Sequence, residues 1–203
     1  MRWRTSLVLS VLSVCATLAL GAGSATAATL YNNAAHFTPV SVGATGSLAL
    51  TSPYTWTQVI TTTGNTPLHA ALNTCTQSTL KVRVGRNDGT VSGTVVTSAF
   101  GGCTPFALVP TLPWTLVVQG AGTSAPPISH WNAALDNFKF VLGGATYSGN
   151  ITTGVTATEP TTGTAPVCIA FKDALSFSGQ LWQNVPTDGT YCFEGAAATW
   201  SLG

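Results

Sequence analysis

The chain has 203 residues, of which only 6% are charged, and its formal net charge is +1. An ordinary soluble domain carries roughly 25% charged residues, so Thr, Ser, Gly and Asn must cover most of this surface. No cluster of Lys and Arg exists that could neutralise several phosphates, which argues against nucleic-acid binding and against a polybasic membrane-surface site.

The N-terminal segment has the parts of an export signal. Arg2 and Arg4 supply its positive charge, an uncharged apolar stretch covers residues 7–20, and Ala25-Thr26-Ala27 is a small-x-small cleavage site. The apolar stretch is about 14 residues long, shorter than the roughly 20 that a membrane-spanning helix needs. We therefore expect residues 1–27 to be a signal peptide and residues 28–203 to form one secreted β domain without a transmembrane segment.

Signal cleavage changes the charge balance. Removing Arg2 and Arg4 leaves five basic and six acidic residues, a net charge of −1. A net charge near zero favours association of a protein with itself or with other surfaces.

Alternation of apolar and polar residues predicts a succession of strands along the mature chain. The apolar positions are Val40 and Val42 with Leu48 and Leu50 (a hairpin around residues 43–46), Leu80, Val82 and Val84, Leu116 and Val118, Phe138, Phe140 and Leu142, Leu175, Phe177 and Leu181, and finally Trp200 and Leu202.

Turn and loop signals separate these runs. We expect turns at Arg86-Asn87-Asp88-Gly89, Gly143-Gly144, Gly149-Asn150 and Asp188-Gly189, and loops at 120–128 and 152–166. Helical periodicity is nearly absent, and its best candidate, Trp131 to Leu135, is barely one turn. Short strands with Gly-rich turns predict an all-β fold, an antiparallel sandwich or barrel.

Four cysteines remain after removal of Cys15 with the signal: Cys75, Cys103, Cys168 and Cys192. An even number of cysteines in an exported chain predicts disulfides. Three pairings are possible, and we favour Cys75–Cys103 and Cys168–Cys192, which join neighbours in the sequence. A zinc site is the competing interpretation, but the chain has no C-x-x-C pair and no Cys/His spacing typical of zinc ligands.

No catalytic motif is evident. The G-x-S-x-G elbow is missing, as are glycine-rich phosphate loops and the H-E-x-x-H metal motif. His36, His69 and His130 are scattered along the chain, so neither a metal site nor a catalytic triad is indicated, and no cofactor is expected.

The tryptophans are the best candidates for ligand contact, since an exposed indole can stack on a sugar ring or hold an apolar ligand. Trp182 falls on the polar face of its predicted strand, and Trp131 is placed in a loop beside His130. We therefore take Trp131, Trp182 and His130 as candidate binding residues. Trp114 and Trp200 are expected in the core or at its rim.

One segment resembles a known family. Cys75, an alternating strand, a Gly-rich hairpin, Cys103 and then Leu112-Pro113-Trp114-Thr115-Leu116 resemble secreted bacterial proteins of the alkane-oxidation activator family, which share an export signal and a late cysteine pair. The resemblance covers roughly residues 40 to 192 in outline. It implies a non-enzymatic extracellular β-protein linked to growth on hydrocarbons, surface filaments or adhesion, and it supplies no catalytic residue.

Three hypotheses follow. The first is a non-enzymatic extracellular or cell-surface protein that associates with itself, as an oligomer or filament, or with cell-surface or hydrophobic material. The alternative is a secreted carbohydrate- or protein-binding module that uses exposed tryptophans. A third is a hydrolase with an unfamiliar site that includes His130 or His69.

Overall fold

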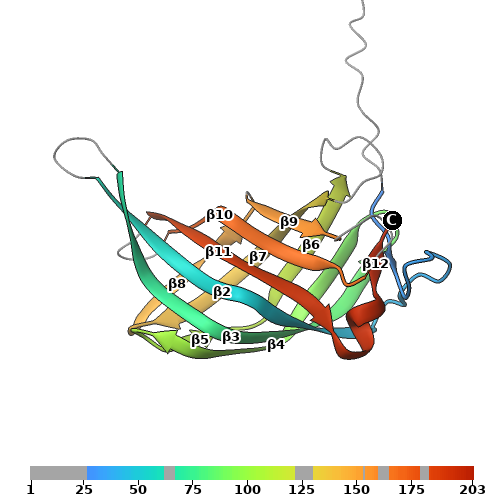
Figure 1. Cartoon of the computed structure of the whole chain (residues 1–203), viewed down its shortest axis with the longest axis horizontal. Helices are drawn as coiled ribbons and strands as arrows, with labels where there is room; N and C mark the ends of the chain where they lie inside the picture. The colour runs from blue at the N-terminus through green and yellow to red at the C-terminus, as the bar shows by residue number, and fades with distance from the viewer. Residues whose placement is uncertain (1–26, 62–66, 122–129, 153, 160–164, 179–182) are drawn as a thin grey trace, which may run out of the picture.

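The computed structural model describes residues 27–61, 67–121, 130–152, 154–159, 165–178 and 183–203, and these are mostly β-strands (Figure 1). Of the predicted signal peptide, residues 1–27, only Ala27 lies within the described residues. In chain order the elements are β1 (Leu30–Tyr31), β2 (Thr45–Thr61), β3 (Pro67–Asn87), β4 (Val91–Thr104), β5 (Leu108–Pro110), β6 (Trp114–Ala121), β7 (His130–Leu142), β8 (Ala145–Ile151), β9 (Val155–Thr158), β10 (Cys168–Ser178), β11 (Gln183–Glu194), the 3₁₀ turn η1 (Gly195–Thr199) and β12 (Ser201–Leu202).

The strands close into an eight-stranded antiparallel barrel. Neighbours around the wall are β7, β6, β4, β3, β2, β11, β10 and β9, and β9 pairs again with β7. The short strands β5 and β8 extend the wall by pairing with the remainder of β7. The predicted all-β class is confirmed, and of its two architectures the barrel is the one formed. Within the described residues, no helix has the length and apolar content needed to cross a bilayer.

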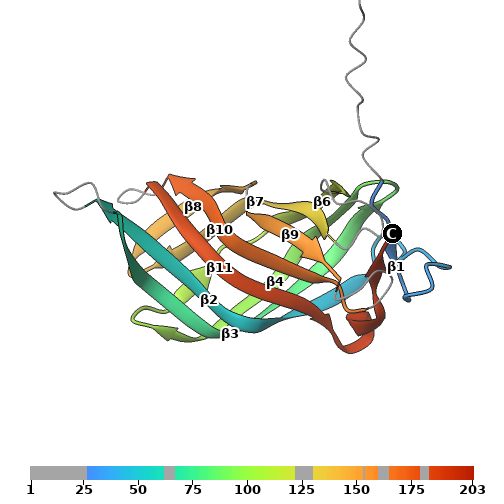
Figure 2. The ribbon, with the colours of Figure 1, turned by 45° about the horizontal axis from the view of Figure 1, so that its top comes forward.

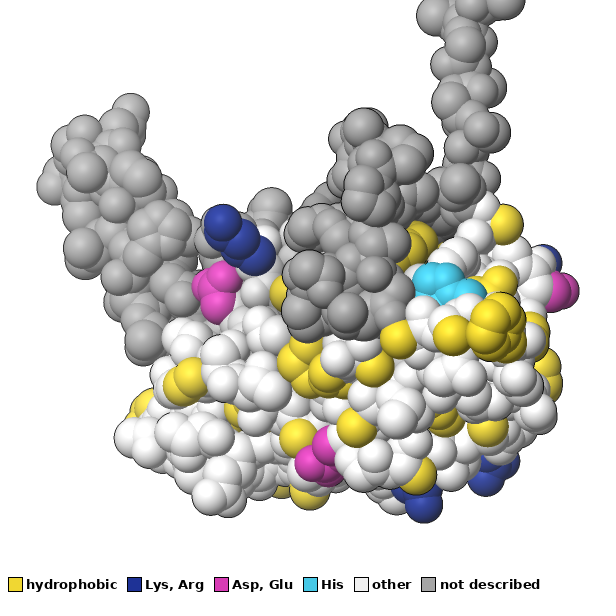
Figure 3. All heavy atoms as spheres, turned by 45° about the vertical axis from the view of Figure 1, so that its right-hand side comes forward, with side chains coloured by type: hydrophobic (Ala, Val, Ile, Leu, Met, Phe, Trp, Pro, Cys, Tyr) yellow, Lys and Arg dark blue, Asp and Glu magenta, His cyan; other side chains and the backbone are white. Residues whose placement is uncertain are grey.

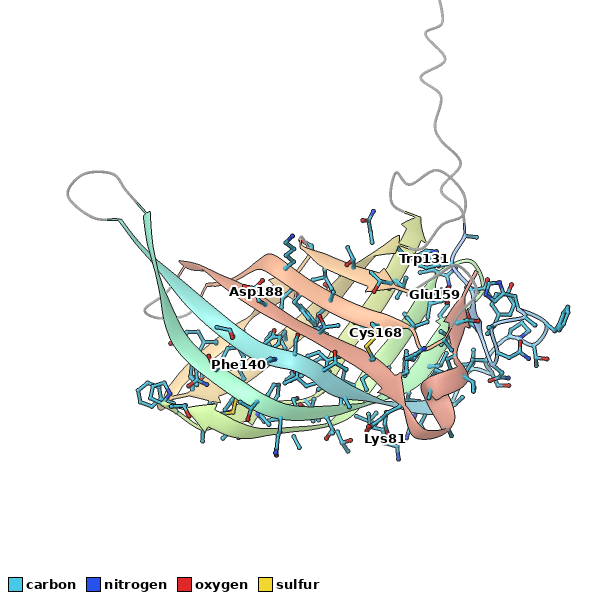
Figure 4. The ribbon with its side chains drawn as sticks, viewed as in Figure 1. Lys81, Trp131, Phe140, Glu159, Cys168 and Asp188 are labelled. Atoms are coloured by element: carbon cyan, nitrogen blue, oxygen red, sulfur yellow. A yellow bond between two sulfur atoms is a disulfide. The ribbon has the colours of Figure 1, made fainter. Side chains whose placement is uncertain are left out.

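The predicted alternation separates the two sides of the wall. On β3, Leu80, Val82 and Val84 are buried in the barrel, whereas Lys81 and Arg83 are exposed. Figure 4 shows Lys81 pointing away from the barrel and Phe140 between its walls. The inward alternation of Phe138, Phe140 and Leu142 and of Leu116 and Val118 is likewise confirmed.

Aromatic rings fill the middle of the barrel. The Tyr54 ring contacts those of Phe171 and Tyr191 edge-on at centroid distances of 5.6 and 5.8 Å. Trp114 packs on Phe138 at 4.4 Å, and its indole N–H donates to the carbonyl oxygen of Thr111 at 2.8 Å. The rings therefore make the interior a solid core.

Both predicted disulfides are confirmed. Cys75 and Cys103 are directly opposite each other on β3 and β4, and Cys168 and Cys192 are opposite each other on β10 and β11. Each bond therefore cross-links two neighbouring strands of the wall.

One end of the barrel is closed by the segment around β1 and by the C-terminal segment that contains β12. β1 pairs with β12, and Ala28, Leu30, Val40, Trp200 and Leu202 are buried there. Figure 3 looks toward this end and shows a mostly uncharged surface with a few charged side chains and scattered hydrophobic ones. The most exposed apolar residues at this end are Phe37 and Val42, at 83% and 65%.

Several local predictions are wrong. Val40 and Val42 form no strand: the Val40 N–H donates to the Leu30 carbonyl at 2.8 Å, so this segment packs against β1 and not against β2. The predicted loop 152–166 contains β9, because Val155 and Ala157 are buried between β7 and β10. Residues 153 and 160–164 of that loop lie outside the described residues, as do 122–129 of the predicted loop 120–128.

Two predicted turns also lie inside strands. Gly149-Asn150 is part of β8, where the Asn150 side chain accepts a hydrogen bond from the Asn137 N–H at a bulge in β7, with a distance of 2.9 Å. Asp188-Gly189 is part of β11, where a Cβ on Gly189 would lie 2.4 Å from a ring carbon of Tyr54. The turn at Gly143-Gly144 is confirmed, and so is a hairpin at 86–89, although Arg86 and Asn87 still belong to β3 and the connection to β4 is 88–90.

Candidate functional site

Trp131 lies in a strand and not in a loop, and the expected helical turn from Trp131 to Leu135 does not form. The residue is the second of β7, in register with Ala121 of β6 and Ala157 of β9. Its side chain is 2% exposed, which leaves no face for a ligand to stack on. Figure 4 shows it near the upper edge of the wall. Strand pairing on both sides and burial of the side chain override the weak local helical pattern.

The other two candidate binding residues are only partly placed. The backbone of His130 begins β7 opposite Thr158, and Trp182 lies outside the described residues. His36 lies in the loop after β1 and stacks on Tyr31 at 4.8 Å, whereas the backbone of His69 is on β3, paired with Val59 of β2. Across the described part of the chain, no three His, Cys, Asp or Glu residues gather as a metal site.

The barrel interior has little room for a ligand. One cavity of about 30 Å³ is lined mainly by Val, Leu, Ile, Phe and Trp, and another of about 10 Å³ lies among Leu48, Leu80 and Tyr191. A cavity of roughly 10–15 Å³ on this measure holds a single water. These cavities are therefore packing gaps and not ligand sites.

The most distinctive feature of the surface is a two-stranded ribbon that projects from the barrel. β11 pairs with β2 only as far as Trp56, and β4 pairs with β3 only as far as Thr74. Beyond these points 57–61 continues to pair with 67–71, residue by residue. Figures 1 and 2 both show this pair of strands leaving the wall at the end opposite β12. We call these two stretches the β2–β3 ribbon.

Each edge of the β2–β3 ribbon lacks a strand partner among the described residues. An unpaired strand edge presents a row of backbone N–H and C=O groups that can pair with another strand. A two-stranded ribbon is also only marginally stable alone, so a further strand would stabilise it. The ribbon therefore presents two edges with which a further strand could pair.

The ribbon lacks the charged residues that commonly protect an exposed edge. Natural edges are commonly blocked by charged side chains, especially Lys, or by inward-pointing charges. The chain carries no Asp, Glu, Lys or Arg anywhere from Ala28 to Leu80, which includes the whole ribbon. Its first strand reads Thr57-Gln58-Val59-Ile60-Thr61, a run with high β-propensity.

The base of the ribbon is anchored to the wall. The Cys75–Cys103 disulfide joins β3 to β4 one residue before their pairing ends, and Tyr54 of β2 is in register with Cys75. Asn73 is 1% exposed, and its side-chain oxygen accepts a hydrogen bond from the Phe106 N–H at 2.9 Å. The ribbon therefore begins at a cross-linked and hydrogen-bonded part of the barrel.

Sequence reasoning missed the ribbon, although its signal was present. The uncharged Thr/Val/Ile-rich run at 57–61 could have been assigned to a strand. The ribbon projects because β2 and β3 extend beyond their neighbours β11 and β4. The register with these neighbours cannot be predicted from a local sequence pattern.

No protein-family model, no curated protein and no solved structure matches this chain.

Proposed function

We propose that this protein is a non-enzymatic extracellular or cell-surface scaffold that associates, through the β2–β3 ribbon, with itself or with another surface. The observation that carries the proposal is an uncharged ribbon with two edges that no described strand covers. The barrel supplies a rigid support, and the ribbon supplies the contact.

Four further features support an extracellular, self-associating role. Residues 1–27 have the composition of an export signal, and two disulfides join neighbouring strands. The low charge of the mature chain provides little electrostatic repulsion against self-association. The resemblance to the alkane-oxidation activator family supports the same kind of role, with hydrophobic material as the surface that the protein contacts.

The ribbon can be removed without disturbing the wall. Trp56 and Asn73 are directly opposite each other, so an Asn-Gly turn in place of residues 57–72 should close a two-residue hairpin between them. We expect this variant to fold with both disulfides and to lose at least about tenfold in binding to hydrocarbon droplets and bacterial cells, or in self-association. Circular dichroism and a cosedimentation assay would measure the two properties.

A charged variant provides the matched control. Replacing Thr57, Val59 and Thr61 by Lys adds three positive charges to the ribbon, whereas Lys at the exposed positions Thr79, Thr97 and Ser148 adds the same charge to the wall. We expect only the ribbon variant to lose association. Equal losses in both variants, or full association without the ribbon, would contradict the proposal.

The tryptophan-based binding module is the less favoured function. Trp114, Trp131 and Trp200 are 1%, 2% and 6% exposed, and these are the tryptophans whose side chains the structure describes. All three are core residues, so the tryptophans whose side chains are described offer no platform for a sugar.

A further inference from the structure

We infer that a second copy of this chain occupies the β2 edge of the ribbon, with residues 57–61 of the two copies paired antiparallel about a two-fold axis at Val59. This inference rests on the proposed function and names the partner of the same site. Pairing of the two ribbons makes one continuous four-stranded sheet, in the order β3, β2, β2 of the second copy, β3 of the second copy.

The β2 edge is the more accessible of the two edges. Residues 57–61 contain no proline, so each of them has a backbone N–H. The β3 edge begins at Pro67, which has no N–H to donate, and at its base the link after β4 lies against it through the hydrogen bond from Phe106 to Asn73. An added strand therefore meets fewer obstacles along β2.

The length of the unpaired segment determines the register. β11 covers β2 up to Trp56, so an added strand can pair only with residues 57–61 on this edge. Two such segments overlap fully when Val59 is opposite Val59 of the second copy. Thr57 then lies opposite Thr61, and Gln58 lies opposite Ile60.

The segment is chemically suited to pairing with itself. Directly opposite like charges destabilise an antiparallel pair, and this register contains no charged residue. Threonine and β-branched residues opposite each other are favourable cross-strand pairs. The same patch on both copies gives an isologous contact, which closes as a dimer and leaves no β2 edge for further copies.

The contact is short, so the dimer should be reversible. Five residue pairs bury less surface than the roughly 1,600 Å² of a standard stable interface. Association should therefore become appreciable at high protein concentration, or where many copies are held close together on a surface.

A charge-swap experiment tests the register directly. In the inferred dimer, Val59→Lys places two positive charges opposite each other and Val59→Glu places two negative charges opposite each other, so each variant alone should dimerise at least about tenfold more weakly than the unmodified chain. An equimolar mixture of the two should recover the dimer, because opposite charges then meet. Sedimentation velocity across a concentration series would measure the dimer fraction.

The matched control uses an exposed position on the wall. Thr97→Lys, Thr97→Glu and their mixture should all dimerise as the unmodified chain does. Circular dichroism should show that every variant is folded.

The inference is overturned if the unmodified chain stays monomeric at high concentration, if it forms species larger than dimers, or if the mixture of Val59 variants fails to recover the dimer. The proposed function has a separate readout. If the ribbon-less chain loses droplet and cell binding while the charge swap fails, the ribbon contacts another partner and only the self-pairing is wrong.

Discussion

At the closed end of the barrel, the side chain of Asn87 connects three segments of backbone. Its oxygen accepts a hydrogen bond from the Leu30 N–H at 2.7 Å, and its amide nitrogen donates to the carbonyl oxygens of Leu30 and Val40 at 2.7 and 2.9 Å. Asn87 is the last residue of β3, so it holds the segment before β2 against the β3–β4 turn.

Removing this side chain should weaken the fold. We expect Asn87→Ala to lower the free energy of unfolding by about 2–3 kcal/mol, because backbone groups of Leu30 and Val40 lose their partners. Asn132, which is exposed on β7, provides the same substitution without these contacts. Urea denaturation of both variants, with the disulfides intact, would measure the difference, and equal stability losses would contradict the assigned role.

Tyr191 is a buried phenol whose ionisation opposes folding. Burial raises the pKa of Tyr191 well above its usual range, and the neighbouring Tyr54 adds to the increase. The folded protein therefore keeps a proton that the unfolded chain releases above about pH 10, so stability falls as the pH rises past that value.

Replacing this phenol by a ring that cannot ionise should protect the protein in alkali. We expect Tyr191→Phe to unfold at a higher pH than the unmodified chain, while its stability below about pH 9 changes little or decreases slightly. Circular dichroism followed through an alkaline titration would give the two midpoints. An unchanged alkaline midpoint would show that other groups control this transition.

The structural roles of two glycines could not be predicted from the sequence around them. Gly89 and Gly189 both follow an aspartate, and both were expected in turns. Gly89 has a left-handed φ of 89° in the β3–β4 turn, whereas Gly189 lies in β11 beneath the ring of Tyr54. A glycine can mark either a turn or a close approach, and the approaching ring here belongs to a residue far away in the sequence.

At the scale of the element, strands with a clear two-residue period were predictable because alternation is local. β3, β6 and β7 each show the expected burial of alternate residues. β9 was missed because its inward residues, Val155 and Ala157, are set in a Thr/Gly-rich stretch typical of loops. The projecting part of β2 was missed for a different reason: its importance depends on where its neighbours end.

The Cys75–Cys103 disulfide should contribute strongly to stability. Closing its loop of 28 residues removes chain entropy from the unfolded state that corresponds to roughly 3–4 kcal/mol. We expect the double variant C75A/C103A to lose about that amount in guanidinium denaturation. The ribbon should then become the first site of proteolysis, since its base loses the cross-link to β4; cleavage elsewhere first would contradict this.

At the scale of the whole molecule, the sequence left the sandwich and the barrel as alternatives. Both architectures use the same alternation and the same turns, and closure depends on the pairing of β9 with β7. The candidate site was even less predictable. Of the residues chosen from the sequence, Trp131 proved to be buried, whereas the ribbon is defined by backbone pairing that ends at Trp56 and Thr74.

The same substitution, Val→Ile, should have opposite effects on stability at the two interior cavities described above. Val118 lines the cavity of about 30 Å³, so Val118→Ile should fill it and stabilise the fold by up to about 0.8 kcal/mol. Val95 lines the cavity of about 10 Å³, so Val95→Ile should overpack the core and lower the free energy of unfolding by about 1–3 kcal/mol. Thermal denaturation would compare the stabilities of the two variants. A loss of stability in both would show that neither cavity can accept a methylene.

The order of the strands has a consequence for synthesis. β2 emerges early from the ribosome, but its partner β11 is separated from it by most of the chain, as the hydrogen bond from Thr51 to Thr190 across 139 positions illustrates. Until β11 has been synthesised, the edge of β2 that pairs with β11 lacks its partner along its full length and carries no charged residue. Chains synthesised close together could then exchange strands before they finish folding, so crowding during synthesis should influence whether independent barrels or strand-exchanged assemblies form.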